Sequence, residues 1–251
     1  MDDWRDVFGH AEPYDEQVDG IETAIDTAED GGFTVVEGAC GTGKTMLALT
    51  AGIDLVRDPD SDYERVLVLT SVKQQLRQFE QDLETINANL PDDWDPVSAL
   101  TLVGKSDVCP YNRENAGGID DENVYERCDS LRERTRDLAG EGGATTAEAL
   151  AAEARSQQID LAGSGAGGAS ASYLESAGEM SPYPPTMPEY DTGGADVEFC
   201  PFYARFLADL PDDGDPAEAV PFDLTETGLL RPDDLVAKGM EYGSCPHSLM
   251  G

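Results

Sequence analysis

The residues Gly38-Ala39-Cys40-Gly41-Thr42-Gly43-Lys44-Thr45 follow one short apolar run, residues 33–36, and precede another, residues 46–49. This is the order of a strand, a glycine-rich loop and a helix. The loop fits the Walker A pattern, in which two glycines separated by four residues are followed by Lys and Thr. Glycines let the backbone turn its N–H groups toward phosphate oxygens, and a helix beginning near Gly43 adds its positive dipole end. We therefore predict a nucleotide phosphate site over residues 38–45.

Each residue of this loop has a predicted part in the site. Lys44 supplies a positive charge for the β- and γ-phosphates and Thr45 a hydroxyl for Mg²⁺, so these two are the candidate catalytic residues. The ATP-binding set also includes Gly38, Ala39, Cys40, Gly41, Thr42 and Gly43, with Cys40 filling a variable position. Gln17 begins a helical pattern over residues 17–29, where its amide either reads an adenine edge or is an exposed polar residue at a helix start.

Two further apolar runs, residues 65–70 and 98–103, alternate with helical patterns over residues 45–56 and 71–86. Strands that alternate with helices form a parallel sheet with right-handed crossovers, so we predict an α/β fold. Ligands of such sheets gather at the carboxyl ends of the strands. The Walker A loop, Thr70 and Lys105 all lie at this predicted edge of the sheet.

The charge of the chain is extreme. Its 251 residues include 52 acidic and 16 basic residues, for a formal net charge of −36. Disorder is disfavoured by an apolar content of 39%, and mimicry of nucleic acid does not explain a Walker A loop. We favour a cytosol of very high salt, because at about 1 M salt the Debye length is only ~3 Å and self-repulsion is screened. The composition resembles that of haloarchaeal proteins.

The sequence predicts a cytoplasmic protein without a membrane partner. No apolar run approaches the ~20 residues that a membrane span needs. The first residues, Met1-Asp2-Asp3-Trp4, lack the basic start and apolar core of a signal peptide. In a reducing compartment, five cysteines point to metal or cluster ligation rather than to disulfides.

Four cysteines form the second candidate site. Cys109, Cys128, Cys200 and Cys245 are separated by 18, 71 and 44 residues, and Pro follows three of them. Zinc sites usually contain close CxxC pairs, and none is present. A [4Fe–4S] cluster needs four cysteines and suits ligands from separate helices. On spacing alone, a cluster, zinc and unrelated buried cysteines all stay open.

The remaining stretches are predicted from composition and period. Residues 109–136 are polar, with a helix in their second half. Residues 139–195 are rich in Gly, Ala, Ser and Pro, so we predict a flexible insertion that buries little, with helical stretches at 146–156 and 172–179. Helices are also expected over residues 197–210 and 232–241.

Together these motifs resemble the amino-terminal part of the iron–sulfur superfamily 2 DNA helicases, the XPD/DinG family. Residues 14–17, 38–45 and 66–78 are similar to the family's Q-type motif, motif I and motif Ia. Lys105 precedes Cys109 as a basic residue precedes the first cluster cysteine in the family. The segments Cys200-Pro201-Phe202-Tyr203 and Cys245-Pro246 look like the contexts of the third and fourth cysteines. The resemblance covers nearly the whole chain apart from residues 139–195.

The resemblance implies an ATP-driven motor that unwinds duplex DNA with 5′-to-3′ polarity. Its fold would be a RecA-like P-loop parallel sheet with an inserted, mainly helical iron–sulfur cluster domain. Residues 1–105 would form the first part of the RecA-like motor domain. Residues 106–251 would form the cluster region, with the low-complexity insertion at about 139–195. The four cysteines would hold the [4Fe–4S] cluster.

The resemblance also places basic side chains beside DNA. Half of the sixteen basic residues lie between Lys73 and Arg136. We expect Lys73, Lys105, Arg127 and Arg132 to contact phosphates of a single strand or a duplex junction. The alternative is that they pair with the many carboxylates nearby, and both stay open because phosphate contacts weaken steeply with salt.

The chain departs from the family in the other half of the ATP site. No run of four apolar residues is followed by Asp-Glu-Ala-His, so beyond Thr45 the sequence shows no group to hold Mg²⁺ or to orient water. We expect a truncated or split chain that binds ATP without hydrolysing it alone, and the carboxyl-terminal motor domain is a candidate partner chain. The alternative function is a nucleotide-binding regulatory or scaffold module with zinc or no metal.

Overall fold

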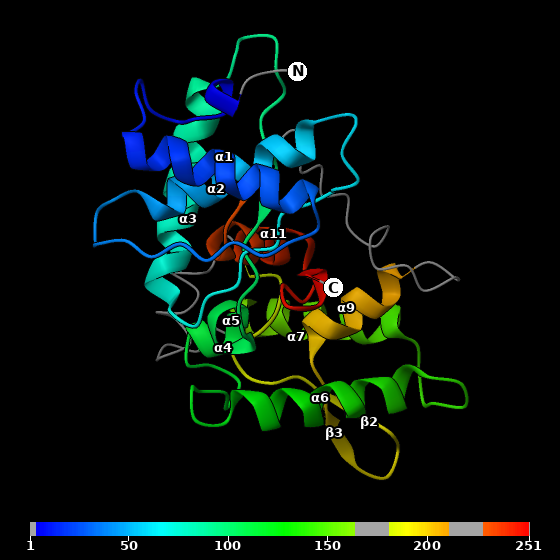
Figure 1. Ribbon diagram of the computed structural model, residues 1–251. Coiled ribbons are helices and arrows are strands. Elements are labelled where there is room, and N and C mark those ends of the chain that lie inside the picture. The colour runs from blue at the N-terminus through cyan, green and yellow to red at the C-terminus, as the bar shows by residue number, and fades with distance from the viewer. Residues whose placement is uncertain (1–3, 164–180, 211–227, 251) are drawn as a thin grey trace. The chain divides into compact units, whose positions relative to one another are not determined.

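The computed structural model describes residues 4–163, 181–210 and 228–250 (Figure 1). These residues divide into two compact units. The first comprises residues 4–100 and 228–229, and the second comprises residues 101–163, 181–210 and 230–250. Each unit has its own apolar core. Within the described part of the chain, none of the helices is both long and apolar enough to cross a bilayer.

Helices are the main secondary structure of the first unit (blue to cyan in Figure 1). They are the 3₁₀ turn η1 (Trp4–Asp6), α1 (Asp15–Glu29), α2 (Lys44–Arg57) and α3 (Lys73–Asn89). Helix α2 packs against both α1 and α3. Residues at helical spacing, such as Ile21, Leu47, Ile53 and Ile86, are buried in the shared core. The helices predicted over 17–29, 45–56 and 71–86 are therefore confirmed, because each has an apolar face to bury.

The predicted P-loop sheet is not found among the described residues. Residues 33–36 and 65–70 have no regular secondary structure, and of residues 98–103 only β1 (Ala99–Leu100) is a strand. Strand β1 pairs with β4 (Leu229–Leu230) in a two-stranded sheet. The prediction of strands at 33–36 and 65–70 is wrong for these residues, because a strand requires a neighbouring strand to bond and the described residues supply none.

The second unit is built from helices of very different length and one hairpin. The helices are α4 (Lys105–Val108), α5 (Pro110–Arg113), α6 (Val124–Ala139), α7 (Ala147–Gly163), α9 (Pro201–Asp209), α11 (Pro232–Tyr242) and the 3₁₀ turn η3 (Ser248–Met250). Strands β2 (Glu189–Asp191) and β3 (Asp196–Glu198) are antiparallel, with Tyr190 opposite Val197. At the centre, the ring of Phe202 meets those of Tyr111 and Tyr183 edge-on, at 5.7 and 4.9 Å between centroids.

The expectation that residues 139–195 bury little is wrong for the parts that the structure describes. Helix α7, which confirms the predicted helix at 146–156, packs against α9 and buries Leu150 and Ala154 completely. Tyr183 is also fully buried, and its hydroxyl donates to the Gly243 carbonyl at 3.0 Å. Small residues on one helical face allow close packing, although their composition is that of a linker. The stretch predicted helical at 172–179 lies outside the described residues.

Candidate functional sites

The Walker A residues form an exposed loop that leads directly into α2. Gly41 (φ 84°) and Gly43 (φ 70°) lie in the left-handed region that favours glycine. Gly43 is the N-cap of α2, so the helix begins at Lys44. Glycines therefore stand where the backbone conformation requires them, and the amino end of a long helix faces the loop.

The side chain of Lys44 turns back over this loop. Its ammonium donates to the carbonyls of Gly38 at 2.9 Å and Ala39 at 2.8 Å. The Thr42 hydroxyl donates to the same Ala39 carbonyl at 3.0 Å. Thr45 lies half-buried in the first turn of α2. A single positive charge is thus held against the loop backbone, where an anionic phosphate would compete with the carbonyls for it.

Gln17 lies beneath the loop and is only 5% exposed. Its Oε1 accepts from the Tyr14 N–H at 3.0 Å, and its Nε2 donates to the Gly43 carbonyl at 3.3 Å. The fit is tight, since a Cβ on Gly43 would approach Nε2 to 2.2 Å. Gln17 therefore braces the junction of loop and helix. The interpretation as an exposed polar residue is wrong, while contact with an adenine stays a prediction.

The four predicted cluster ligands all lie in the second unit. Cys109 is the N-cap of α5 and Cys200 the N-cap of α9, each followed by Pro at the first helical position. Cys128 lies on α6, and Cys245 follows α11. All four are partly buried, whereas Cys40 of the loop is exposed. The fold therefore brings cysteines from four separate segments into one unit.

Electrostatics show that these four thiols are neighbours. Burial is the main cause that raises the pKa of Cys109 to about 12, and the nearby Cys245 and Cys128 contribute to that rise. Burial also raises the pKa of Cys200 well above its usual range, with contributions from each of the other three thiols. Together they can become thiolates only if a cationic group offsets the shared charge. This donor set fits an iron–sulfur cluster or a thiolate-bound metal.

Among the residues that the structure describes, no three His, Cys, Asp or Glu side chains converge as one metal ion requires. A tetrahedral zinc holds every sulfur at about 2.3 Å, whereas each cysteine of a [4Fe–4S] cluster binds a different iron. A cluster, zinc and unrelated buried cysteines therefore all stay open for these four side chains.

Lys105 is engaged beside the cysteines rather than displayed to solvent. Its side chain is 13% exposed and forms an ion pair with Asp129, the residue after Cys128. The hydrogen bond from Lys105 lowers the pKa of Asp129. Burial, and then the charge of Lys105, lower the pKa of His247, whose buried Nδ1 has no hydrogen-bond partner among the described residues.

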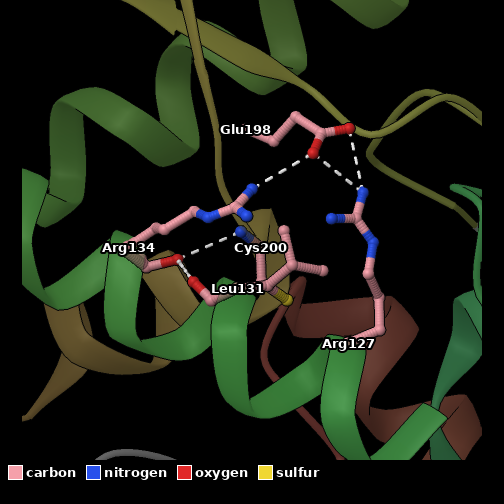
Figure 2. A network of polar contacts seen from close by, with 6 residues as sticks. Arg127, Leu131, Arg134, Glu198 and Cys200 are labelled. Atoms are coloured by element: carbon pink, nitrogen blue, oxygen red, sulfur yellow. Dashed lines mark hydrogen bonds and ion pairs between the residues drawn. The ribbon is translucent and has the colours of Figure 1, made fainter. Parts of the chain in front are cut away.

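Arg127 and Arg134 of α6 converge on Glu198 of β3, as Figure 2 shows. Arg127 donates to both carboxylate oxygens at 2.9 Å, and Arg134 donates to one of them at 3.2 Å. In the same network the Cys200 N–H donates to the Thr135 hydroxyl at 3.0 Å (Figure 2). For Arg127, therefore, the structure shows the carboxylate pairing that the sequence left open.

The other two basic candidates have different surroundings. Arg132 lies over the ring of Tyr203 at 4.4 Å, and Arg136 lies 5.1 Å from the same centroid. Lys73 is exposed at the start of α3 in the first unit. Sequence reasoning missed the role of Tyr203, although its place three residues after Cys200 on a helix was a usable signal.

Comparisons of this chain with protein-family models, with curated proteins and with solved structures match nothing. What the chain does is therefore inferred from its own motifs and geometry. Two features carry that inference: the Walker A loop on α2 and the four gathered cysteines.

Proposed function

We propose that this chain is the ATP-binding and [4Fe–4S]-binding part of an ATP-dependent DNA helicase of the XPD/DinG type. The observation that carries the proposal is the gathering of Cys109, Cys128, Cys200 and Cys245 in one helical unit, within a chain whose other unit holds a Walker A loop. A Walker A loop alone is shared by many NTPases. Its combination with four widely spaced cluster cysteines narrows the class.

ATP would bind at residues 38–45 with its phosphates toward the amino end of α2. Lys44 would exchange the carbonyls of Gly38 and Ala39 for the β- and γ-phosphates, and Thr45 would hold Mg²⁺. Gln17 would keep the Gly43 junction in shape. Hydrolysis needs further groups that hold Mg²⁺ and orient the attacking water. A carboxyl-terminal RecA-like part would supply these groups, and the complete motor would have a parallel sheet beside the loop.

The four cysteines would hold the cluster, which would join α6, α9 and the segments around α5 and α11 into one rigid body. The Glu198 network and the Thr135 hydroxyl position the backbone at Cys200 for this task. DNA would lie near this unit, with 5′-to-3′ movement along a single strand from a duplex junction. A cytoplasmic, halophilic setting belongs to the same proposal.

Anaerobic reconstitution with iron and sulfide tests the cluster. We expect an orange-brown protein with absorbance near roughly 400 nm and about four irons per chain. Each Cys→Ala change among the four ligands should lower the iron content, and Cys40→Ala is the matched control because Cys40 is exposed in the other unit. A colourless, iron-free protein overturns the cluster, and bound zinc favours the regulatory or scaffold module.

Binding of a fluorescent ATP analogue tests the loop. Charge-assisted hydrogen bonds contribute roughly 1.5–3 kcal/mol, so Lys44→Ala should weaken binding by about 10- to 100-fold with an unchanged circular dichroism spectrum. Lys238→Ala on α11 removes the same charge from the second unit and should change nothing. Equal affinities for wild-type protein and Lys44→Ala would contradict the phosphate site.

A further inference from the structure

A cavity of about 1130 Å³ opens in the first unit, where α1 and α2 end. Asp26 and Glu29 line it from the last turn of α1, and Leu55 and Arg57 line it from the last turn of α2. The chain that follows α2, residues 58–63, forms a further wall. This volume just exceeds the roughly 300–1,000 Å³ of ordinary ligand sites, so a single metal ion would not fill it.

The apolar part of the lining is aromatic. Trp4 and Trp94 are the only tryptophans of the chain, and both line the cavity. The guanidinium of Arg57 lies 4.6 Å from the Trp94 centroid, and that of Arg5 lies 4.3 Å from the Trp4 centroid. The electron-rich face of an indole attracts cations. Both rings are therefore already in contact with positive charge in this part of the fold.

The polar part of the lining is acidic, and Arg57 is its one basic residue among the described residues. The carboxylates of Asp26, Glu29 and Asp62 form no hydrogen bond or ion pair within the described part of the chain. The carboxyl ends of α1 and α2 add the negative ends of two helix dipoles, and α1 has no basic residue in its last turn. The cavity therefore disfavours anions and favours a cationic ligand.

The combination of separate carboxylates and indole rings narrows the class of cation. Ammonium groups can meet the carboxylates at the mouth of the cavity, while methylene groups leave water against the rings. A linear polyamine carries both kinds of group in alternation. The segments 164–180 and 211–227 of this chain contain neither Lys nor Arg, so they have no side-chain cation to offer in its place.

We propose that this cavity binds a linear polyamine. Its ammonium groups lie at Asp26, Glu29 and Asp62, and its alkyl segments lie against Trp4 and Trp94. The inference uses no residue of the Walker A loop and none of the cysteines. It therefore stands or fails independently of nucleotide and cluster binding.

Intrinsic fluorescence tests the proposal directly, because both tryptophans of the chain line the cavity. The probe is spermine, titrated into the full chain. At about 1 M KCl the Debye length is ~3 Å, which suppresses binding to scattered surface carboxylates. We expect a saturating change of fluorescence with spermine under these conditions. Magnesium chloride that supplies the same total positive charge should not reproduce it.

A triple variant locates the site. Asp26→Asn, Glu29→Gln and Asp62→Asn together remove three carboxylates from exposed residues of the lining, so the circular dichroism spectrum should stay unchanged. Exposed charge pairs contribute little singly, but the loss of three should weaken spermine binding at least about threefold.

The matched control removes two Asp and one Glu charges from exposed residues of the second unit, by Glu133→Gln, Asp137→Asn and Asp196→Asn. It should bind spermine as the wild-type chain does. Equal weakening in the two triple variants would show a general effect of surface charge and overturn the proposal. Absence of a saturating change with spermine, or an equal response to magnesium, would overturn it too.

Discussion

Phe202→Ala is the sharpest test of how the cysteine unit is held together. The ring is 2% exposed and meets Tyr111 and Tyr183 edge-on, at 5.7 and 4.9 Å between centroids. Its carbonyl also accepts the N–H of Cys245 at 3.0 Å. Truncation of a buried Phe costs about 3–5 kcal/mol, and loss of two aromatic contacts places this site at the upper end of that range.

The assay uses the uneven placement of the aromatic residues. The chain has two tryptophans, Trp4 and Trp94, and both lie in the first unit. Tryptophan fluorescence therefore reports unfolding of the first unit, while hydrogen exchange at α6 and α9 reports that of the second. With an m-value of about 2 kcal/mol per molar urea, the midpoint of the second unit should fall by roughly 2 M in Phe202→Ala. The tryptophan transition should not move.

Phe33→Ala makes the same chemical change at a side chain that is 98% exposed. It should alter the free energy of unfolding by less than about 0.5 kcal/mol, as for other surface changes. If Phe202→Ala lowers the free energy of unfolding of the second unit by less than about 1 kcal/mol, this ring is not a main packing residue of that core. An equal shift of both transitions would refute the separate cores of the two units.

Three further predictions concern pH, an ion-pair network and the loop. Burial raises the pKa of Cys109 to about 12 from a usual 9.0. As pH rises, the unfolded chain therefore loses this thiol proton before the folded chain does. The urea midpoint of the metal-free protein should fall as pH rises from about 9 toward 12. Glu198→Gln weakens the ion pair with Arg127, whose side chain is only 23% exposed. It should lower the free energy of unfolding by about 1–2 kcal/mol in chemical denaturation. Glu64→Gln is the control, because it lies in an exposed ion pair and should have little effect. Gly43→Ala adds a Cβ at φ 70° that would lie 2.2 Å from a neighbouring amide nitrogen, and titration with an ATP analogue should show at least about tenfold weaker binding.

The helices were predictable because their signal is local. Apolar residues recur at helical spacing in α1, α2, α3, α9 and α11, and Pro stands at the first position of α9 and α11. Helix α7 was placed correctly, but its burial was missed. Whether an alanine-rich face is packed depends on what lies opposite it, and here that is α9.

The strands were not predictable from the runs alone, because a strand is a relation between two segments. Residues 33–36 and 65–70 have the apolar content of buried strands, yet the described residues contain no partner to bond them. Some predictions of side-chain roles were wrong or incomplete for a similar reason. Arg127 bonds Glu198, which is 71 residues away, and Gln17 bonds Gly43, which is 26 residues away. No local pattern announces either contact.

The sequence by itself determined the order of the Walker A loop and its helix, and it singled out the four cysteines. Spacing and residue type decide these features, since glycine conformation and helical period act over a few neighbouring residues. Only the tertiary structure decided that the cysteines are neighbours and that Arg127 and Lys105 are paired with carboxylates. It also left the side chains of Phe33, Val35, Leu67 and Leu69 exposed. These outcomes depend on distant segments that meet in space, and burial then sets the charge and exposure of each side chain.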